Sequence, residues 1–585
     1  MKPLSTYIEF LLMTRHYAFV PGLGGFMFQE EPARLMLGGR LMPPLRMLKY
    51  NRFMDHDDGM LANIVMRAEH LSYDEANQSI RLSVNDLLNR VQHEGRCALG
   101  RLGFVFFDEE CHMVARADKE HRQYYPEEGW VEHDAEEIYQ NVVATIRQLV
   151  SQSPTPPTPQ WSLAITNQRE TVVVWDRHSG KPISRAIVWQ DTRGRDLCHR
   201  LQAEGHGPMV MERAGLLIDP NFSAPGVAWL LGHTPGAREA AQKGDLLLGT
   251  IDTWLVWRLT GGRVHATDTT NASRTMLFNI HTMQWDDDLL RLFGIPRSMM
   301  PGVLPCDGIY GETAVEGLFA KPIKIAGVLG DSHAALVGQM CFHEGMGKVT
   351  YGTGSSVMVN IGEKPLPAPA GLVTSVAFSA LGRHYYGYEG NIYSTGATLK
   401  WLAEQMKMAA HPRDMEAEAR SVPSSGGVYV VPAFSGLGAP WWQSGVRGAI
   451  FGLTFATTRA HLLRAAIESI AFQIKDLVDA MTRATGSKLS EIAADGGPTK
   501  NRLLMQLQAD LLQTPVVCTE VDDASALGAA IMGGLATGTW HAFDEVKTLR
   551  KVTQAIVPGS DSHEEAYRGW LHAVNTLRSS PSTEP

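Results

Sequence analysis

The stretch KIAGVLGDSHAALVGQMCFHEGMGKVTYGTGSS (Lys324–Ser356) contains two apolar runs, and each run ends in a turn rich in glycine and polar residues. The first run, Ile325–Leu329, is followed by Gly330 and Asp331 and then by small residues that suit a helix. The second run opens into Gly352-Thr353-Gly354. This alternation predicts a strand, an acidic turn, a helix, a second strand and a glycine turn.

Both turns carry residues that could take part in chemistry. Asp331 is expected at the start of a helix, where the helix N-terminus favours negative charge and a carboxylate can act as a general base. Gly352 and Gly354 allow the backbone to approach an anion closely, and Thr353 adds a hydroxyl donor. Together they suggest phosphoryl transfer to a hydroxyl group. A helix cap beside a tight turn would leave the same pattern, so both interpretations stay open at this point.

Length and composition narrow the class of protein. A chain of 585 residues with 44% hydrophobic content predicts about three domains with sizeable cores. The net charge of −9 argues against a general nucleic-acid binder. The six cysteines are scattered without a CxxC pair, which argues against a zinc site and favours a reducing cytoplasm. No apolar run reaches the length of a membrane helix, and Glu9 interrupts the apolar start, so a signal peptide is not predicted.

Residues 1–118 are predicted to form a small separate α+β domain. VPGLGGF (Val20–Phe26) suggests a turn between strands, Ser72 and Glu75 suggest a capping box for a helix, and CALGRLGFV (Cys97–Val105) suggests a hairpin. The block resembles bacterial HU-like domains, which are related to histone-like DNA-bending proteins. However, 14 Lys and Arg residues stand against 16 Asp and Glu residues through Glu120, so charge does not support DNA binding. A dimerising or packing module is the alternative.

From about Glu120 to residue 560 the chain carries a long series of motifs, and a proline-rich stretch that cannot continue a helix, SPTPPTP (Ser153–Pro159), lies between the first and the second of them. The motifs are GWVEHD (Gly129–Asp134), ITNQRET (Ile165–Thr171), AIVWQDTR (Ala186–Arg193), GTIDTWLVWRLTGG (Gly249–Gly262), TDTTNASRTMLFNI (Thr267–Ile280), YGTGS (Tyr351–Ser355), FSGLGAPWW (Phe434–Trp442), RGAIFGLT (Arg447–Thr454), DGGPTKNRLLMQLQADLL (Asp495–Leu512) and SALGAA (Ser525–Ala530). In this order they resemble the FGGY carbohydrate kinases, most closely those of the glycerol-kinase type.

The resemblance implies an α/β fold with two actin-like, ribonuclease H-like domains around a cleft. The expected boundaries are 119–340 for the substrate domain, 341–560 for the nucleotide domain, and 561–585 for a C-terminal helix and tail. Such a protein would work in the cytoplasm, without membrane contact, as a homo-oligomer (dimer or tetramer).

The resemblance also assigns roles to residues. Asp331 would be the catalytic base and a metal ligand. The residues expected to bind substrate are Arg169, Glu170, Trp189, Asn221, Asp331, Ser332 and Ser356. Those expected to bind the nucleotide are Gly352, Thr353, Gly396, Lys400, Gly497 and Asn501. Arg169 and Glu170 offer fixed donors and acceptors for adjacent hydroxyls, although a surface ion pair would use the same residue types.

The chain departs from the family pattern in two ways. The family's opening hairpin carries an Asp-x-Gly-Thr-Thr-Ser phosphate loop, and no such motif precedes Gly129, so the first hairpin of the kinase is expected to be missing. In addition, Asn221, Ser332 and Ser356 stand where the glycerol-kinase type has Tyr, Gln and Phe. All three replacements remove bulk, which favours a roomier pocket for a longer polyol or ketose.

The function expected from the resemblance is ATP-dependent, magnesium-assisted phosphorylation of a primary hydroxyl of glycerol or a somewhat larger polyol or ketose. The missing loop makes turnover of this chain doubtful. Two alternatives stay open: a catalytically impaired pseudokinase that binds sugar or nucleotide, and a DNA-associated regulator with a kinase-like sensor domain.

Overall fold

The computed structural model describes residues 99–152, 161–315, 317–319, 321–443, 445–519, 521 and 523–579, together with separate stretches between residues 17 and 80. By its internal contacts the chain divides into two units, Met1–Leu99 and Gly100–Pro585, and each is described by itself. No helix among the described residues is long and apolar enough to cross a membrane.

The first unit contains a small antiparallel sheet with the strand order β1-β2-β5. Its described elements are β1 (Tyr17–Val20), β2 (Gly24–Glu31), β3 (Arg34–Leu35), β4 (Leu41–Met42), β5 (Leu45–Asn51) and α2 (Met60–Glu69). Val20 pairs with Gly24, so the predicted glycine-rich turn does separate two strands, although Gly24–Phe26 already belong to β2. The helix predicted to start at Ser72 lies mostly outside the described residues.

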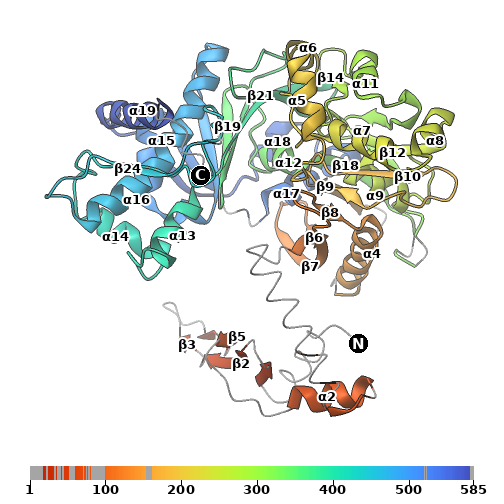
Figure 1. Ribbon diagram of the computed structural model, residues 1–585, viewed down its shortest axis with the longest axis horizontal. Helices are drawn as coiled ribbons and strands as arrows, with labels where there is room; N and C mark the ends of the chain where they lie inside the picture. Colours follow the sequence, from red (N-terminus) through yellow and green to blue (C-terminus); the bar gives the residue numbers. More distant parts are fainter. Residues whose placement is uncertain are drawn as a thin grey trace. The chain divides into compact units, whose positions relative to one another are not determined.

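The second unit begins with an α/β lobe, here called the first lobe (Figure 1). Its elements are β6 (Leu99–Phe107), β7 (Met113–Tyr124), β8 (Glu132–His133), α4 (Ala135–Gln152), β9 (Ser162–Asn167), β10 (Val172–Asp176), β11 (Ala186–Ile187), α5 (Arg195–Ala203), α6 (Gly207–Ala214), α7 (Ser223–His233), α8 (Ala237–Lys243), β12 (Leu246–Thr250), α9 (Ile251–Leu259), β13 (Ala266–Asp268), α10 (Thr269–Ala272), β14 (Phe278–Asn279), β15 (Gln284–Trp285), α11 (Asp287–Phe293), η1 (Arg297–Met299), β16 (Gly302–Leu304), β17 (Ile309–Glu312), β18 (Lys324–Gly330) and α12 (Asp331–Gly338).

A second lobe follows, built on a seven-stranded sheet with the order β21-β22-β20-β19-β25-β26-β27. Its elements are β19 (Met346–Tyr351), β20 (Ser355–Asn360), β21 (Val373–Ala380), β22 (Arg383–Ile392), α13 (Gly396–Glu404), η2 (Pro412–Asp414), α14 (Met415–Ala419), β23 (Tyr429–Val431), β24 (Ala449–Phe451), α15 (Arg459–Thr485), β25 (Glu491–Gly496), η3 (Gly497–Lys500), α16 (Arg502–Leu512), β26 (Val516–Thr519), α17 (Ala524–Thr537), α18 (Phe543–Lys547), β27 (Val552–Ile556) and α19 (Glu564–Ser579).

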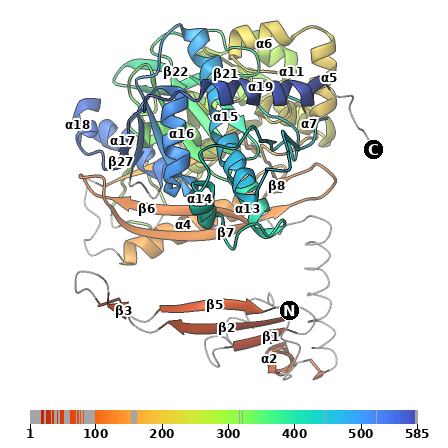
Figure 2. The same cartoon turned by 90° about the vertical axis from the view of Figure 1, so that its left-hand side faces the viewer.

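The second unit starts at Gly100, earlier than the start at residue 119 expected for the substrate domain. β6 and β7 end a six-stranded sheet of order β12-β10-β11-β8-β7-β6 (Figure 2). β6 reads LGRLGFVFF, so it supplies a strand but none of the Asp and Thr residues of the expected phosphate loop. The alternating apolar residues of this segment suit an HU-like hairpin equally well, which is why the sequence pattern misplaced the boundary.

The central sheet of the first lobe is interrupted between β6 and β9. β9 pairs in parallel with β18 in a separate sheet of order β17-β18-β9, so β6 and β9 are both end strands. A cavity of about 1300 Å³ lies between them, and all of Leu102–Phe107 and Trp161–Gln168 border it. Because alternate residues of a strand point to opposite faces, an unbroken run of lining residues indicates that the cavity meets the backbone edges of both strands.

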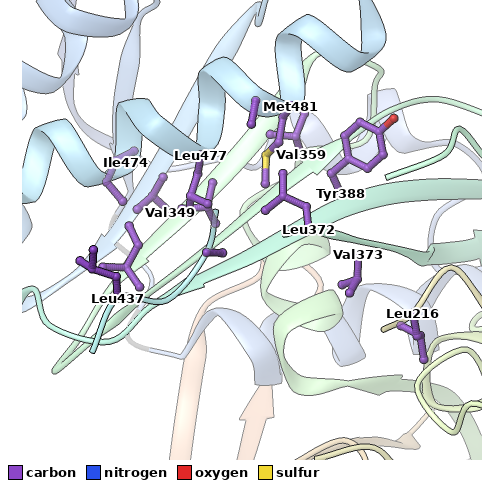
Figure 3. Close-up of a cluster of buried hydrophobic side chains, with 14 of the residues drawn as sticks. Leu216, Val349, Val359, Leu372, Val373, Tyr388, Leu437, Ile474, Leu477 and Met481 are labelled. Atoms are coloured by element: carbon purple, nitrogen blue, oxygen red, sulfur yellow. The ribbon is translucent and has the colours of Figure 1, made fainter. Parts of the chain in front are cut away.

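The largest hydrophobic cluster extends from the first lobe into the second, where α15 packs on the second sheet. Figure 3 shows Ile474, Leu477 and Met481 of α15 against Val349 and Val359 of the sheet. α15 is buried along most of its length, as its apolar periodicity predicts. The opposite face of the sheet packs against α12, where Met346 and Met358 join a second cluster.

The crossing of α12 and α17 explains the SALGAA motif. A Cβ atom on Gly528 would lie 1.8 Å from the carbonyl oxygen of Ala334, and one on Gly338 would lie 1.9 Å from that of Ala524. The two helices therefore meet backbone to backbone, which only glycine allows. α17 also packs on β18 and β9, so this helix of the C-terminal half covers the sheet of the first lobe.

Candidate active site

Asp331 is the first residue of α12, directly after β18, as the sequence predicted. Its Oδ1 atom accepts a hydrogen bond from the Ser332 amide (2.7 Å) and lies 3.1 Å from Nε of Arg169. The Asp331 side chain is 47% exposed, in contrast to the buried groups around it. A half-exposed carboxylate fixed at one oxygen keeps its other oxygen available to an incoming group.

Arg169 follows β9 and is held by carboxylates from both lobes. Its two terminal nitrogens donate to the two oxygens of Glu389 at 2.8 Å each, while its Nε faces Asp331. Glu389 lies on β22 of the second lobe, so this bidentate pair links the lobes at the candidate site. The paired carboxylates raise the pKa of the Arg169 guanidinium, against the effect of burial.

A second arginine completes the network. Arg274 donates from Nε to Glu170 (2.6 Å) and lies 2.9 Å from Glu389 through Nη1. Burial alone would raise the pKa of Glu389, but Arg169 and Arg274 outweigh it and hold that pKa well below its usual range. Glu389 and Arg274 were not assigned roles from the sequence. The available signal was a single charged residue inside each of two otherwise apolar or small-residue stretches, YYGYEGNI and TNASRTML.

Arg169 and Glu170 are therefore less open than the sequence suggested. They are 8% and 6% exposed and are committed to Glu389 and Arg274. Glu170 has a positive φ of 64°, and its carbonyl accepts a hydrogen bond from Ser223 at the start of α7. The network orients Arg169 and presents Asp331 at its exposed edge.

The remaining residues predicted to bind substrate lie on both sides of this network. Trp189 is 43% exposed just after β11, and its amide donates to the hydroxyl of Thr171 (3.3 Å). Asn221 is half-buried two residues before Ser223, where its amide donates to Asp219. Ser332 is half-buried beside Asp331.

Ser356 is engaged in a different contact from the one predicted. Its hydroxyl accepts a hydrogen bond from Nζ of Lys348 (3.2 Å) across the β19–β20 hairpin. A polar contact therefore stands where the glycerol-kinase type has an aromatic side chain, and a roomier pocket would depend on Asn221 and Ser332 alone.

The predicted nucleotide residues gather at the ends of β19 and β25, which run parallel and side by side. The amides of Gly396 and Ala397, at the start of α13, donate to the carbonyls of Gly352 and Thr353. A Cβ atom on Gly396 would lie 2.4 Å from the Gly352 carbonyl, so glycine is required for this approach. The carboxyl ends of parallel strands are where α/β folds bind ligands.

The other nucleotide residues differ in how directly they face this turn. Gly497 is exposed at the start of η3, where Pro498 lies near Gly396. Asn501 is the N-cap of α16, and its side-chain oxygen accepts from the Leu504 amide, so only its amide nitrogen is open to a ligand. Lys400 lies on the exposed side of α13, 3.8 Å from Glu404, and is not directed at the turn by any contact among the described residues.

Comparison with known proteins agrees with this geometry. The family model for the N-terminal domain of the FGGY family of carbohydrate kinases matches residues 101–338, and the model for its C-terminal domain matches 347–537. The first match begins within β6. Residues 1–58 match the model of the CCDC81-like prokaryotic HU domain 1, so an HU-like resemblance at the N-terminus is confirmed over that shorter range.

Glycerol kinases from Geobacillus sp. (strain WCH70) and Thermus thermophilus are each 46% identical over 472 residues, which is 80% of this chain and 95% of each relative. Among solved structures, Plasmodium falciparum glycerol kinase with ADP has a TM-score of 0.79 at 34% identity, covering 82% of this chain and 97% of that one. A xylulose kinase from Lactobacillus acidophilus (TM-score 0.75, 21% identity, 82% of this chain and 98% of that one) shares the two-domain fold.

Proposed function

Because the chain belongs to the FGGY family of carbohydrate kinases, we propose that it transfers the terminal phosphoryl group of ATP to a primary hydroxyl of glycerol or a somewhat larger polyol or ketose. The observation that carries the proposal is Asp331: a half-exposed carboxylate beside Arg169 at the first turn of α12. The similar glycerol kinases, including one solved with ADP, support this choice of substrate class.

Asp331 is positioned to take the proton of the attacking hydroxyl. Arg169 holds one of its oxygens at 3.1 Å and limits its rotation, while the Glu389 fork limits the motion of Arg169. Phosphoryl transfer needs positioning and charge stabilisation more than covalent help from the protein. A base fixed in this way satisfies the positioning requirement on the acceptor side.

The residues present fit a nucleotide and a divalent metal. Gly396 approaches the Gly352 carbonyl so closely that a side chain there would clash, and Thr353 is exposed beside this contact. Asp331 would hold the metal, which we take to be Mg²⁺ because hard oxygen ligands and phosphates suit it. The metal would supply neutralisation of phosphate charge.

The substrate preference follows from the smaller side chains. Asn221 and Ser332 are both half-buried near the network, and both are shorter than the Tyr and Gln of the glycerol-kinase type. We therefore expect a four- or five-carbon polyol or ketose to compete well with glycerol.

A pseudokinase is the second candidate, and the absent phosphate loop favours it. β6 carries no Asp or Thr, and one lost donor to a developing charge costs about 10²–10³ in rate. We therefore propose that turnover of this chain is low. Replacing residues 1–118 with a family-type opening hairpin should raise turnover by at least about 10³-fold on the same estimate.

The HU-like match at residues 1–58 favours a further role in contact with DNA or with a second copy of the chain. We propose dimer or tetramer formation first, because the balanced charge of the N-terminal block gives little attraction to phosphates. Sedimentation of the full chain tests assembly, and a DNA shift assay at several salt concentrations tests the alternative. The five described cysteines form no disulfide, which fits the proposed cytoplasmic location.

The experiment that tests the main proposal is an ADP-release assay with ATP and Mg²⁺ across glycerol, erythritol, xylulose and ribulose. We expect release that depends on both polyol and ATP and that is abolished in Asp331→Asn. Binding of polyol and nucleotide with no ADP release from any of them would favour the pseudokinase, and no binding of either ligand would reject both candidates.

A further inference from the structure

Lys348 occupies an unusual position behind the glycine turn. In the register of the sheet, Thr350 pairs with Ser356 on one side and with Asp495 on the other, so these three residues form a row across β20, β19 and β25. Lys348 lies one step back on the same face, between Met358 and Ala493. That face packs against α12, the helix that begins with Asp331.

The charge of Lys348 is buried without an ion pair. The residue is 1% exposed, and its Nζ donates to the hydroxyls of Thr350 and Ser356 at 3.2 Å each. An ammonium group has three donors, and among the described residues no carboxylate forms an ion pair with this one. Buried charges are normally paired, because an unpaired one pays the full cost of desolvation. Burial lowers the pKa of Lys348, although Asp495 opposes the shift.

A second uncommitted polar atom lies at the end of the same row. Oδ2 of Asp495 accepts from Nε2 of Gln339 (2.8 Å), but Oδ1 is buried and has no hydrogen-bond partner among the described residues. Buried polar atoms without partners are rare in folded proteins. One spare donor and one spare acceptor therefore lie close together beneath the turn.

The two buried arginines near the site are already neutralised. Arg169 is bound to Glu389 and Asp331, and Arg274 is bound to Glu170 and Glu389. Lys348 donates hydrogen bonds only to hydroxyls, and none of the carboxylates that act on its charge, Asp495, Glu389 and Asp331, forms an ion pair with it. An anion at that turn would complete the electrostatics of the buried row.

We propose that Lys348 is a positioning residue for the phosphate groups of the bound nucleotide, which it holds at the Gly352–Gly354 turn through its charge and through the hydroxyls of Thr350 and Ser356. This inference rests on the proposed function and extends it, because it places the phosphate-neutralising charge in the second lobe. It also explains a serine at position 356. The Ser356 hydroxyl anchors the ammonium group at the hairpin, where a phenylalanine side chain could not accept its hydrogen bond.

The test compares ADP with adenosine, since the two ligands differ only in the charged part. Binding of both to the full chain is measured by titration calorimetry for wild type and for Lys348→Met, which keeps the length of the side chain. Loss of a unit charge near the anion predicts ADP binding weaker by about 10- to 100-fold, with adenosine binding nearly unchanged. If Lys348 had only a structural role, its loss would weaken the binding of ADP and adenosine equally or would change neither.

Lys475→Met on α15 is the matched control. Lys475 is paired with Asp479 (3.1 Å) and packs over the ring of Tyr567, so the same chemical change there should leave both affinities unchanged. Lys348→Gln serves as a second variant if the methionine variant does not fold. Ser356→Ala keeps the charge and removes one anchor, and should weaken ADP binding by a smaller factor than Lys348→Met.

The inference is overturned if Lys348→Met keeps the wild-type ratio of ADP to adenosine affinity, or if wild type itself shows no preference for ADP. Loss of the preference in a protein that phosphorylates no polyol would uphold the role of Lys348 and reject only the proposed function. If the protein phosphorylates a polyol but Lys348→Met keeps the wild-type ratio of ADP to adenosine affinity, the proposed function is upheld and the role of Lys348 is rejected.

Discussion

Replacing Glu389 with Gln should destabilise the protein through the charge network rather than through packing. Glu389 is 1% exposed and accepts three close contacts, two from Arg169 at 2.8 Å and one from Arg274 at 2.9 Å. Gln has nearly the same shape but no charge, and it places an amide donor against a guanidinium group. The variant thus leaves two buried arginines with Glu170 and Asp331 as their remaining carboxylates.

The magnitude can be worked from these contacts. Removing one partner of a buried ion pair costs about 3–5 kcal/mol, because the remaining charge stays desolvated. The two charge-assisted hydrogen bonds from Arg169, at about 1.5–3 kcal/mol each, suggest a loss of similar size, and the Gln oxygen keeps at least one of them. We expect a loss of about 3–5 kcal/mol, a large share of the about 5–15 kcal/mol that stabilises a typical protein.

Urea denaturation of the full chain, followed by tryptophan fluorescence at pH 7, measures the loss. Glu363→Gln is the matched control, since Glu363 pairs with Arg383 at 2.9 Å with both side chains more than half exposed. Such a surface pair is worth about 0–1 kcal/mol. If Glu389→Gln costs no more than Glu363→Gln, the assignment of Glu389 as the charge that holds the two arginines is refuted.

Acidification should weaken the same charge network by protonating the Glu389 carboxylate. The pKa of Glu389 is lowered from its ordinary value of 4.5, so its stabilising effect is fully present above that value. It is lost as the pH falls through the lower pKa of the folded state. The difference in stability between wild type and Glu389→Gln should therefore shrink at acid pH, and a constant difference would contradict this origin.

Three further predictions concern the base, the pocket and a buried acid. Asp331→Asn should lower kcat by roughly two to four orders of magnitude while ADP affinity is largely kept, and unchanged turnover would reject Asp331 as the base. Restoring Tyr and Gln at Asn221 and Ser332 should shift kcat/KM toward glycerol, each good contact being worth about 1–3 kcal/mol. An unchanged ratio of glycerol to erythritol would contradict the size difference as the cause of the preference. Burial, together with the neighbouring Asp268, raises the pKa of Asp252 to about 7. The folded state therefore binds this proton more tightly than the unfolded state, and the free energy of unfolding should fall as the pH rises from about 4 to 7. Asp252→Asn cannot titrate, so denaturation at pH 5 and pH 8 should show a flatter profile for this variant, and equal slopes would argue against the assignment.

The local parts of the site were predictable because they depend on short stretches of chain. Asp331 at the start of α12 and the turn at Gly352–Gly354 both follow from apolar runs that end at glycine. The same holds for the long buried helix α15. Periodicity and turn residues are local signals, and here nothing in the tertiary structure overrides them.

The partners across the site were not predictable in this way. Arg169 and Glu389 are 220 residues apart, and Arg274 and Glu170 are 104 apart, so only the fold brings their charges together. The contact between Lys348 and Ser356 depends on the register of one hairpin, which the sequence does not state. The segment that forms β6 was assigned to the HU-like block because its alternating residues fit two different folds.

The interruption between β6 and β9 also divides the first lobe into parts that can open separately. The β6–β7 hairpin reaches its own sheet through the short pairing of Gln123 and Tyr124 with β8, and it rests on α4. β9, by contrast, is paired to β18 and covered by α17. Amide hydrogens of β6 and β7 are therefore expected to exchange with solvent long before those of β9 and β18, so this strand pair should behave as an independently opening unit.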